Sequence, residues 1–350
     1  MRKGDSIKYL AVVIIVFNTT FSFAQLQYQE RLPRDVFDVA APSTRVTGTP
    51  GDMAYLERNC RAIATDNLRQ RIVNTAIQEW SYFGHALYDL THTRDDNPDY
   101  RRRPWTRPRI DYNEAIRVVD SIAGYWSSTP NSAWILEKQN QSWLDRGAGS
   151  RWRDPWSAAF ISWVMCESGL GDDRRFRRAI AHHSYIDQAI RARNDNESLS
   201  AYVAYDSGEL AIEPGDLLCR GMRPNYQSLA ARQSQMGVGA RTHCDIVVKL
   251  DSDNNQIMLI GGNVRGWVRL KLLPADINDN GYLEAAPYNS RRIFAHLKLQ
   301  ADSIPNNALE LSPSIQSLSC QEKGSLSRVV DSPNCSYCLL YTSPSPRDRG

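Results

Sequence analysis

Ser157 lies at the start of a short apolar stretch, in a setting where a hydroxyl could act as a nucleophile. Asp154 is a good N-cap and Pro155 a good first helical residue, so the sequence predicts a helix that begins here. Apolar residues then recur at helical spacing: Trp156, Ala159, Phe160, Trp163 and Val164. Unpaired backbone N–H groups and the helix dipole stabilise negative charge in a first turn. Ser157 is therefore either a nucleophile or an ordinary serine of an amphipathic core helix.

Three later stretches place polar residues in strand-like settings. They are Glu213-Pro214-Gly215-Asp216-Leu217-Leu218, Thr242-His243-Cys244-Asp245-Ile246-Val247-Val248 and Gln256-Ile257-Met258-Leu259-Ile260-Gly261-Gly262-Asn263. Together with the Trp-Ser-Ala-Ala-Phe start of the helix, they resemble cell-wall hydrolases of the CHAP and NlpC type. Those enzymes have a Trp-Cys-Ala-x-Phe helix, a Pro-Gly-Asp strand, a strand that opens with His, and a polar residue on the next strand. Over about residues 61–300, the chain is more similar to an uncharacterised bacterial domain family allied to them.

The resemblance implies a papain-like site with Ser157 in the place of the usual Cys. His243, 86 positions after Ser157, would take the proton of the nucleophile. Asn263, 20 positions further on, would orient the imidazole. These three residues are the predicted catalytic set.

The segment His182-His183-Ser184-Tyr185 corresponds to a region that borders the substrate groove in the resembling hydrolases. Adjacent His residues on a helix point about 100° apart, so they do not form a metal pair of the i, i+4 kind. We predict that His183, Tyr185 and Trp156 bind substrate. A surface or core role stays open for at least one of the two His residues.

A serine nucleophile makes a stronger demand on the third group than a cysteine does. Replacing the buried Asp of a serine protease by Asn lowers the rate by about 10⁴, so Ser157 with His243 and Asn263 would be slow. Asp245 lies two residues from His243 on one strand, and both side chains therefore project to the same face. We hypothesise that Asp245 supplies the negative charge, because Gly261 stands where the hydrolases often carry an acid. The alternative is that Asp245 hydrogen-bonds the backbone or a basic side chain.

Residues 1–24 are typical of a secretory signal peptide. Basic residues precede an apolar run over residues 9–17, and Ser22-Phe23-Ala24 forms a small-x-small cleavage site before Gln25. The run is short for a bilayer span, although a retained anchor is the alternative. We expect an exported protein, periplasmic or secreted, without stable membrane insertion after cleavage.

The rest of the chain divides into four segments by composition and periodicity. Residues 25–60 predict an extended arm or linker, and residues 61–300 one compact domain. Ser and Pro multiply beyond residue 301, which predicts a tail over residues 301–337. Residues 338–350 resemble the translation of a sequencing-library adapter and are excluded from the fold prediction.

Helical periodicity gives way to strand periodicity within residues 61–300. Helices are predicted over residues 68–83, 111–126, 155–164 and 175–193, and strands over residues 214–219, 241–250, 256–261, 264–272 and 292–299. This order predicts an α+β fold. The resemblance further implies a papain-like domain whose N-terminal helices pack on a short antiparallel barrel-like sheet, with Cys219 and Cys244 on neighbouring strands as the best disulfide pair.

Charge and ligand patterns limit the partners. The leader holds three basic and one acidic residue, and residues 338–350 two and one; the 42 basic and 39 acidic residues of the chain thus leave 37 of each. This balance gives no support for nucleic-acid binding. The basic run over residues 101–109 is either a solvated loop or a contact with an anionic surface polymer. A calcium-like loop at residues 276–281 has Pro287 where Glu is required, so we predict neither metal nor cofactor.

Three functions are compatible with these residues. The first is an exported hydrolase that cleaves an amide of peptidoglycan or a related peptide through Ser157. The second is an inactive papain-like module that binds cell-wall peptides or glycans. The third is a hydrolase with another nucleophile, for which Cys166 is too far along the helix. The sequence does not indicate the oligomeric state.

Overall fold

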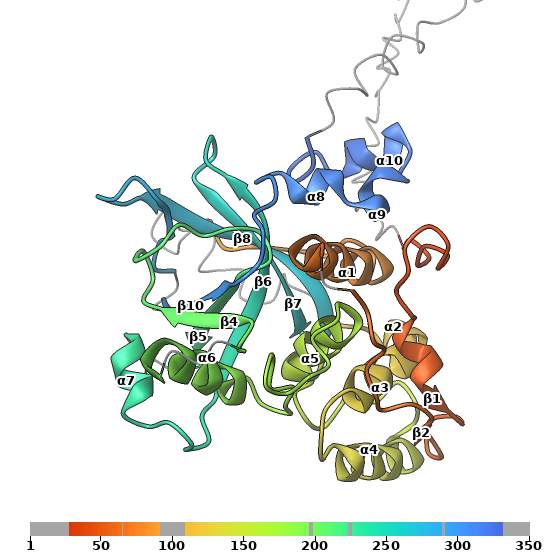
Figure 1. Cartoon of the computed structure of the whole chain (residues 1–350). Coiled ribbons are helices and arrows are strands. Elements are labelled where there is room, and N and C mark those ends of the chain that lie inside the picture. The colour runs from red at the N-terminus through yellow and green to blue at the C-terminus, as the bar shows by residue number, and fades with distance from the viewer. Residues whose placement is uncertain are drawn as a thin grey trace, which may run out of the picture.

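A large twisted sheet forms the centre of the protein (Figure 1). The computed structural model describes residues 28–64, 66–91, 109–195, 199–222, 226–288 and 291–331. In these ranges the sheet has eight strands: β3 (Leu87–Asp89), β4 (Tyr202–Tyr205), β5 (Leu217–Gly221), β6 (Thr242–Asp251), β7 (Gln256–Val264), β8 (Trp267–Ile277), β9 (Leu283–Ala285) and β10 (Ile293–Leu299).

The sheet is open, which corrects the barrel-like sheet expected from sequence. The strand order is β3-β8-β7-β6-β5-β10-β4, with β9 paired to β8. Neighbours are antiparallel except for β3, which runs parallel to β8. Closure would require the edge strands β3 and β4 to pair. They stand at opposite ends of the order, and α6 packs against β4.

Helices pack on and around this sheet and confirm the α+β class. They are α1 (Leu68–Tyr82), α2 (Tyr112–Arg117), α3 (Val119–Ser127), α4 (Ala133–Arg146), α5 (Ser157–Glu167), α6 (His183–Asp195), α7 (Leu229–Gln233), α8 (Ala308–Leu311), α9 (Pro313–Gln316) and α10 (Cys320–Ser325). Local signals set several ends. Asp111 caps α2 by accepting the Glu114 N–H, as predicted, and Gly84 follows α1 with a φ of 78°. Helix α4 was not predicted.

Helix α5 is the central helix and fixes the position of Ser157. All eleven of its residues are buried, because it contacts α1 and α3 as well as β6 and β7. The ring of Tyr125 on α3 packs against Trp156, Phe160 and Trp163, with centroids 5.2–5.8 Å apart. The helix begins at Ser157 itself, two residues later than predicted, while Asp154 pairs with Lys138. Ser157 is therefore held at a rigid helix start.

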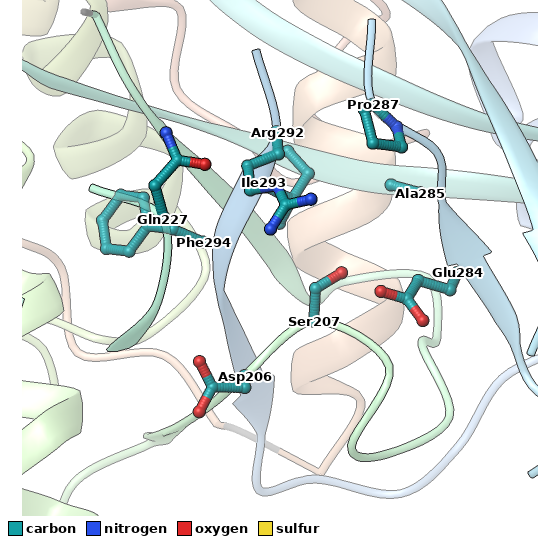
Figure 2. Close-up of a pocket in the computed structure, with 9 residues that line it drawn as sticks. All are labelled: Asp206, Ser207, Gln227, Glu284, Ala285, Pro287, Arg292, Ile293 and Phe294. Carbon is teal, nitrogen blue, oxygen red and sulfur yellow. The ribbon is translucent and has the colours of Figure 1, made fainter. Parts of the chain in front are cut away.

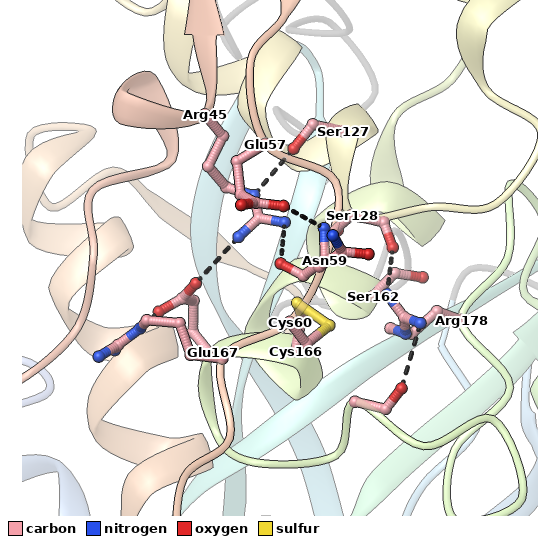
Figure 3. Close-up of a disulfide and its surroundings, with 12 residues drawn as sticks. Arg45, Glu57, Asn59, Cys60, Ser127, Ser128, Ser162, Cys166, Glu167 and Arg178 are labelled. Carbon is pink, nitrogen blue, oxygen red and sulfur yellow. Dashed lines mark hydrogen bonds and ion pairs between the residues drawn. A yellow bond between two sulfur atoms is a disulfide. The ribbon is translucent and has the colours of Figure 1, made fainter.

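Two disulfides cross-link the described chain. Cys219 and Cys244 face each other on β5 and β6 with Cα atoms 4.1 Å apart, which confirms the predicted pair. A second bond, which was not predicted, joins Cys60 to Cys166 near the end of α5 (Figure 3). Beside it the buried Glu167 accepts hydrogen bonds from Arg45 and Arg61. The N-terminal segment is thus attached to the central helix by a covalent bond and by ion pairs.

The segments expected to be an arm and a tail both contribute to the core. Within residues 28–60, a 3-10 helix (Pro42–Arg45) and the short strands β1 (Val46–Thr47) and β2 (Ala54–Tyr55) are formed, and Phe37 and Val39 are buried. Near the other end, α8 and α9 pack on α1. The serines that suggested a tail serve as caps, since Ser312 is the N-cap of α9 and Ser319 the N-cap of α10.

No helix in the described ranges is long and apolar enough to cross a membrane. The predicted leader, most of the basic run over residues 101–109, and residues 338–350 lie outside the described residues.

The two disulfides should contribute differently to stability. Because the Cys60–Cys166 bond closes a separation of 106 residues and Cys219–Cys244 one of 25, loop entropy gives ~4.8 and ~3.5 kcal/mol. We expect Cys60→Ala/Cys166→Ala to lose more unfolding free energy than Cys219→Ala/Cys244→Ala in urea titrations. Cys320→Ser is the control and should change nothing, since Cys320 is unpaired among the described cysteines. The reverse order of the two losses would contradict this account.

A chain that ends at Gln300 should lose most of its stability. It would expose apolar residues of the core and leave Lys249 without Glu310 and Asp331, which lie 2.6 and 2.7 Å from its Nζ atom. Each buried aliphatic side chain stabilises a fold by ~1.5–3 kcal/mol. The matched control ends at Tyr337 and should keep the melting temperature of the full chain. A Gln300 chain that melts within about 2 °C of the full chain would show that α8–α10 add little.

Candidate functional site

Ser157 meets a histidine at the start of α5, but a different histidine from the one predicted. Its Oγ atom lies 2.7 Å from Nε2 of His182, and both residues are buried. No hydrogen bond joins Ser157 to His243 in the described structure. The rings of His182 and His243 are 5.1 Å apart between centroids, so His182 lies between the serine and the predicted base.

His182 is held at the point where β6 and β7 separate. The described ladder between these strands ends at Ile246 and Ile260, so the amide of Cys244 has no partner on β7. It donates instead to Nδ1 of His182, over 3.2 Å. The Tyr185 hydroxyl, three residues along α6, hydrogen-bonds the same Nδ1 atom.

These contacts assign the tautomer of His182. A backbone amide can only donate, so Nδ1 must carry the lone pair. The proton of the neutral ring is then on Nε2, and this N–H donates to Ser157. Burial, and secondly the neighbouring His243, hold the pKa of His182 well below its usual value, so that the ring is neutral.

His243 belongs to a second buried group, with Asp245 and Lys271. Nε2 of His243 lies 2.9 Å from Oδ1 of Asp245, as expected for two side chains on one face of β6. The Lys271 ammonium on β8 lies 2.7 and 2.6 Å from the two oxygens of Asp245 and 3.1 Å from His243. Asp245 therefore contacts His243, as hypothesised, and also a basic side chain, as in the alternative.

The pKa values of this group follow from burial and mutual attraction. Burial lowers the pKa of His243 to about 4, against the opposing effect of Asp245. Burial also lowers the pKa of Lys271 to about 8. Although burial alone raises the pKa of Asp245, His243 and Lys271 bring it far below its usual value. The group thus holds one anion matched by one cation, beside a neutral imidazole.

Gly261 on β7 provides the space for Asp245. A Cβ atom at this position would lie 1.8 Å from Oδ1 of Asp245 and 3.3 Å from Nε2 of His243. The next residue, Gly262, faces the other way, where its Cβ would meet Phe160 of α5. His243 and Asp245 therefore lie on the face of β7 opposite α5. The carboxylate of Asp245 fills the place of a side chain at position 261.

Asn263 and His183 do not join these groups. Asn263 has a left-handed backbone, with a φ of 56°, and its side chain makes no hydrogen bond to a described residue. His183 accepts a long hydrogen bond from the Ala240 amide, over 3.4 Å. Neither forms a described hydrogen bond with Ser157 or His243, so the orienting role of Asn263 and the substrate-binding role of His183 stay predictions.

Two of the predicted substrate-binding residues are core residues. Trp156 is 2% exposed and packs on Phe83 and Tyr125, and Tyr185 is 1% exposed and stacks on Phe176. Their rings therefore support the site from inside and offer no surface to a ligand. Tyr185 acts on the site through its hydroxyl, by way of His182.

Sequence reasoning missed His182 and Lys271, and only His182 left a signal. His182, Tyr185, Ile186 and Ala189 recur at i, i+3, i+4 and i+7, which assigns His182 and not His183 to the buried helical face. Lys271 lies two residues after Arg269 in a strand where basic and apolar residues alternate, and this pattern does not show that the basic face is buried. The sequence does not identify the partner of either residue. No group of three His, Cys, Asp or Glu residues in the described ranges is placed to hold a metal.

A family described as uncharacterised proteins conserved in bacteria, DUF2272, matches residues 114–297, which is more than half of the chain. The match contains Ser157, His182, His243, Asp245 and Lys271. No curated protein and no solved structure matched the chain.

The buried histidines should make the protein less stable in mild acid. Below pH ~6.5 the unfolded chain binds protons that folded His182 and His243 do not, so stability falls as the pH falls. From pH 7 to pH 5, each should cost about 2 kcal/mol of unfolding free energy in urea titrations.

His182→Gln should remove about half of this loss, because it removes one of the two titrations. His183→Gln is the neighbouring control and should remove less, since that ring is only partly buried. Equal pH dependence in wild type and His182→Gln would contradict the buried neutral state of His182.

Proposed function

We propose that this chain, which belongs to the DUF2272 family of uncharacterised bacterial proteins, is an exported module that binds cell-wall peptides or glycans without cleaving them. The observation that carries the proposal is the bond from the Cys244 amide to Nδ1 of His182. The cell-wall target rests on the resemblance of the Ser157 helix and the three strand motifs to CHAP and NlpC hydrolases. Export rests on the predicted leader.

The tautomer of His182 is the wrong one for activating Ser157 as a nucleophile. A general base needs a lone pair on the nitrogen that faces the hydroxyl. Here Nε2 of His182 carries the proton, and this N–H donates a hydrogen bond to Ser157. In serine proteases a histidine held in the wrong tautomer lowers kcat by about 10⁴.

The surrounding charges also oppose a positive imidazole. A base that takes the serine proton becomes an imidazolium, and burial with the adjacent His243 lowers the pKa of His182. Asp245 would stabilise that cation, but Lys271 already lies 2.6 Å from it and neutralises its charge. The site therefore lacks the uncompensated negative charge on which a Ser-His pair depends.

The same geometry suits recognition of a carbonyl or carboxylate oxygen. Because Ser157 accepts from His182, its own hydroxyl hydrogen is available to donate. It is presented at the first turn of α5, where the dipole favours an oxygen that carries negative charge. Amide carbonyls and carboxylates of a cell-wall peptide provide such acceptors.

A second candidate, hydrolysis of an amide through Ser157, is favoured by one distance. Oγ of Ser157 is 2.7 Å from Nε2 of His182, which is within reach for proton transfer. To act as a base, His182 would need its proton on Nδ1, where the N–H would donate a hydrogen bond to the Tyr185 hydroxyl. The Cys244 amide would then lose its acceptor, at a cost of about 1–3 kcal/mol.

Binding and turnover by three proteins separate the two functions. Wild type, Ser157→Ala and Ser157→Cys are incubated with purified sacculi for binding, and with soluble muropeptides for cleavage followed by mass spectrometry. We expect wild type to bind sacculi and to release no cleaved product. Ser157→Ala should bind about 2–10-fold more weakly, since it loses one hydrogen bond.

Ser234→Ala, which changes the exposed serine that follows α7, is the matched control and should bind like wild type. Cleavage by wild type that is absent from Ser157→Ala would establish the hydrolase and reject the binding module. Wild type that neither binds nor cleaves would reject the cell-wall target for both.

A further inference from the structure

A small cavity lies between the loop after β4, β9 and the start of β10 (Figure 2). Its volume is about 190 Å³. Sites for drug-sized ligands measure ~300–1,000 Å³, so this cavity suits a ligand of amino-acid or monosaccharide size.

Apolar and charged residues both line the cavity. Ile293, Phe294 and Ala285 are its buried apolar residues. In Figure 2 the carboxylates of Asp206 and Glu284 and the guanidinium of Arg292 lie around it on different sides. The fold thus brings charges of both signs to one small opening.

These charged groups keep unused hydrogen-bonding capacity. Asp206 accepts the Leu229 amide through Oδ1 only, over 2.8 Å. Glu284 receives a single long contact from Asn278, over 3.4 Å, through Oε2. Arg292 forms no ion pair with a described residue. Two carboxylate oxygens and a guanidinium therefore remain for a ligand.

We propose that this cavity binds a basic α-amino acid, with its carboxylate on Arg292 and its ammonium groups on Asp206 and Glu284. The two carboxylates and one guanidinium carry a net charge of −1, which a ligand with two ammonium groups and one carboxylate neutralises. A simple anion would be repelled by the two carboxylates, and a simple cation would be repelled by Arg292. A neutral sugar leaves all three charges unmatched. The inference goes beyond the proposed function and does not depend on Ser157.

Four probe compounds test this charge pattern by calorimetry on the full chain. Lysine carries all three charges, norleucine lacks the side-chain ammonium, cadaverine lacks the carboxylate, and N-acetylglucosamine represents a neutral sugar. We expect lysine to bind more tightly than the other three by about tenfold or more, because each lost charge removes a charge-assisted hydrogen bond. No binding of lysine at millimolar concentration, or tighter binding of N-acetylglucosamine, would overturn the proposal.

Variants identify the residues that bind lysine. Arg292→Met should weaken the binding of lysine about tenfold or more and should not weaken the binding of cadaverine. Asp206→Asn and Glu284→Gln keep their shapes and their existing acceptors, so they should fold and bind lysine more weakly. Arg177→Met removes an exposed arginine that does not line the cavity and should bind lysine like wild type.

Two results with these variants would reject the site. The first is an equal loss in Arg177→Met, which would indicate nonspecific charge attraction. The second is unchanged lysine binding in Arg292→Met. Ser157→Ala should bind lysine normally, so failure of the proposed cell-wall module and failure of this cavity give different results.

Discussion

The hydrogen bond from the Cys244 amide to His182 is the constraint on which the site depends. A buried backbone N–H must find an acceptor, and β7 turns away from β6 before it reaches Cys244. His182 supplies the acceptor, and the disulfide to Cys219 keeps the donor on its strand. The ring then faces Ser157 with Nε2–H and packs against His243. Ser157, at the helix start, thus accepts a hydrogen bond from His182 and does not face the lone pair of a base.

The charges of Asp245 and Lys271, which lie near the His182 ring, cancel each other, and this keeps the ring neutral. A buried carboxylate without a partner is costly, and removing one partner of a buried ion pair typically costs about 3–5 kcal/mol of stability. Asp245 is matched by Lys271 across β7, and Gly261 leaves room for the contact. Because these charges cancel, His182 experiences no net attraction for a second proton. The residues that suggest a hydrolase in sequence are therefore arranged around a neutral imidazole.

Local patterns predicted the elements, and distant contacts decided the site. Periodicity gave most of the helices and strands, and alternation placed His243 and Asp245 on one face. The tautomer of His182 depends on a residue 62 positions away, at a place where two strands separate, and no local pattern encodes that separation. The open sheet depends on which strands become edges. The C-terminal helices were missed because serine caps and a disordered tail have similar composition.

The proton position on His182 tests the account most directly. Long-range ¹H–¹⁵N correlation NMR of the histidine rings at pH 7, with His182 assigned from the spectrum of His182→Gln, distinguishes the protonated nitrogen from the lone-pair nitrogen. The account predicts a neutral ring with the proton on Nε2 and the lone pair on Nδ1. A proton on Nδ1 with a lone pair on Nε2 would contradict it and give Ser157 the base that a hydrolase requires.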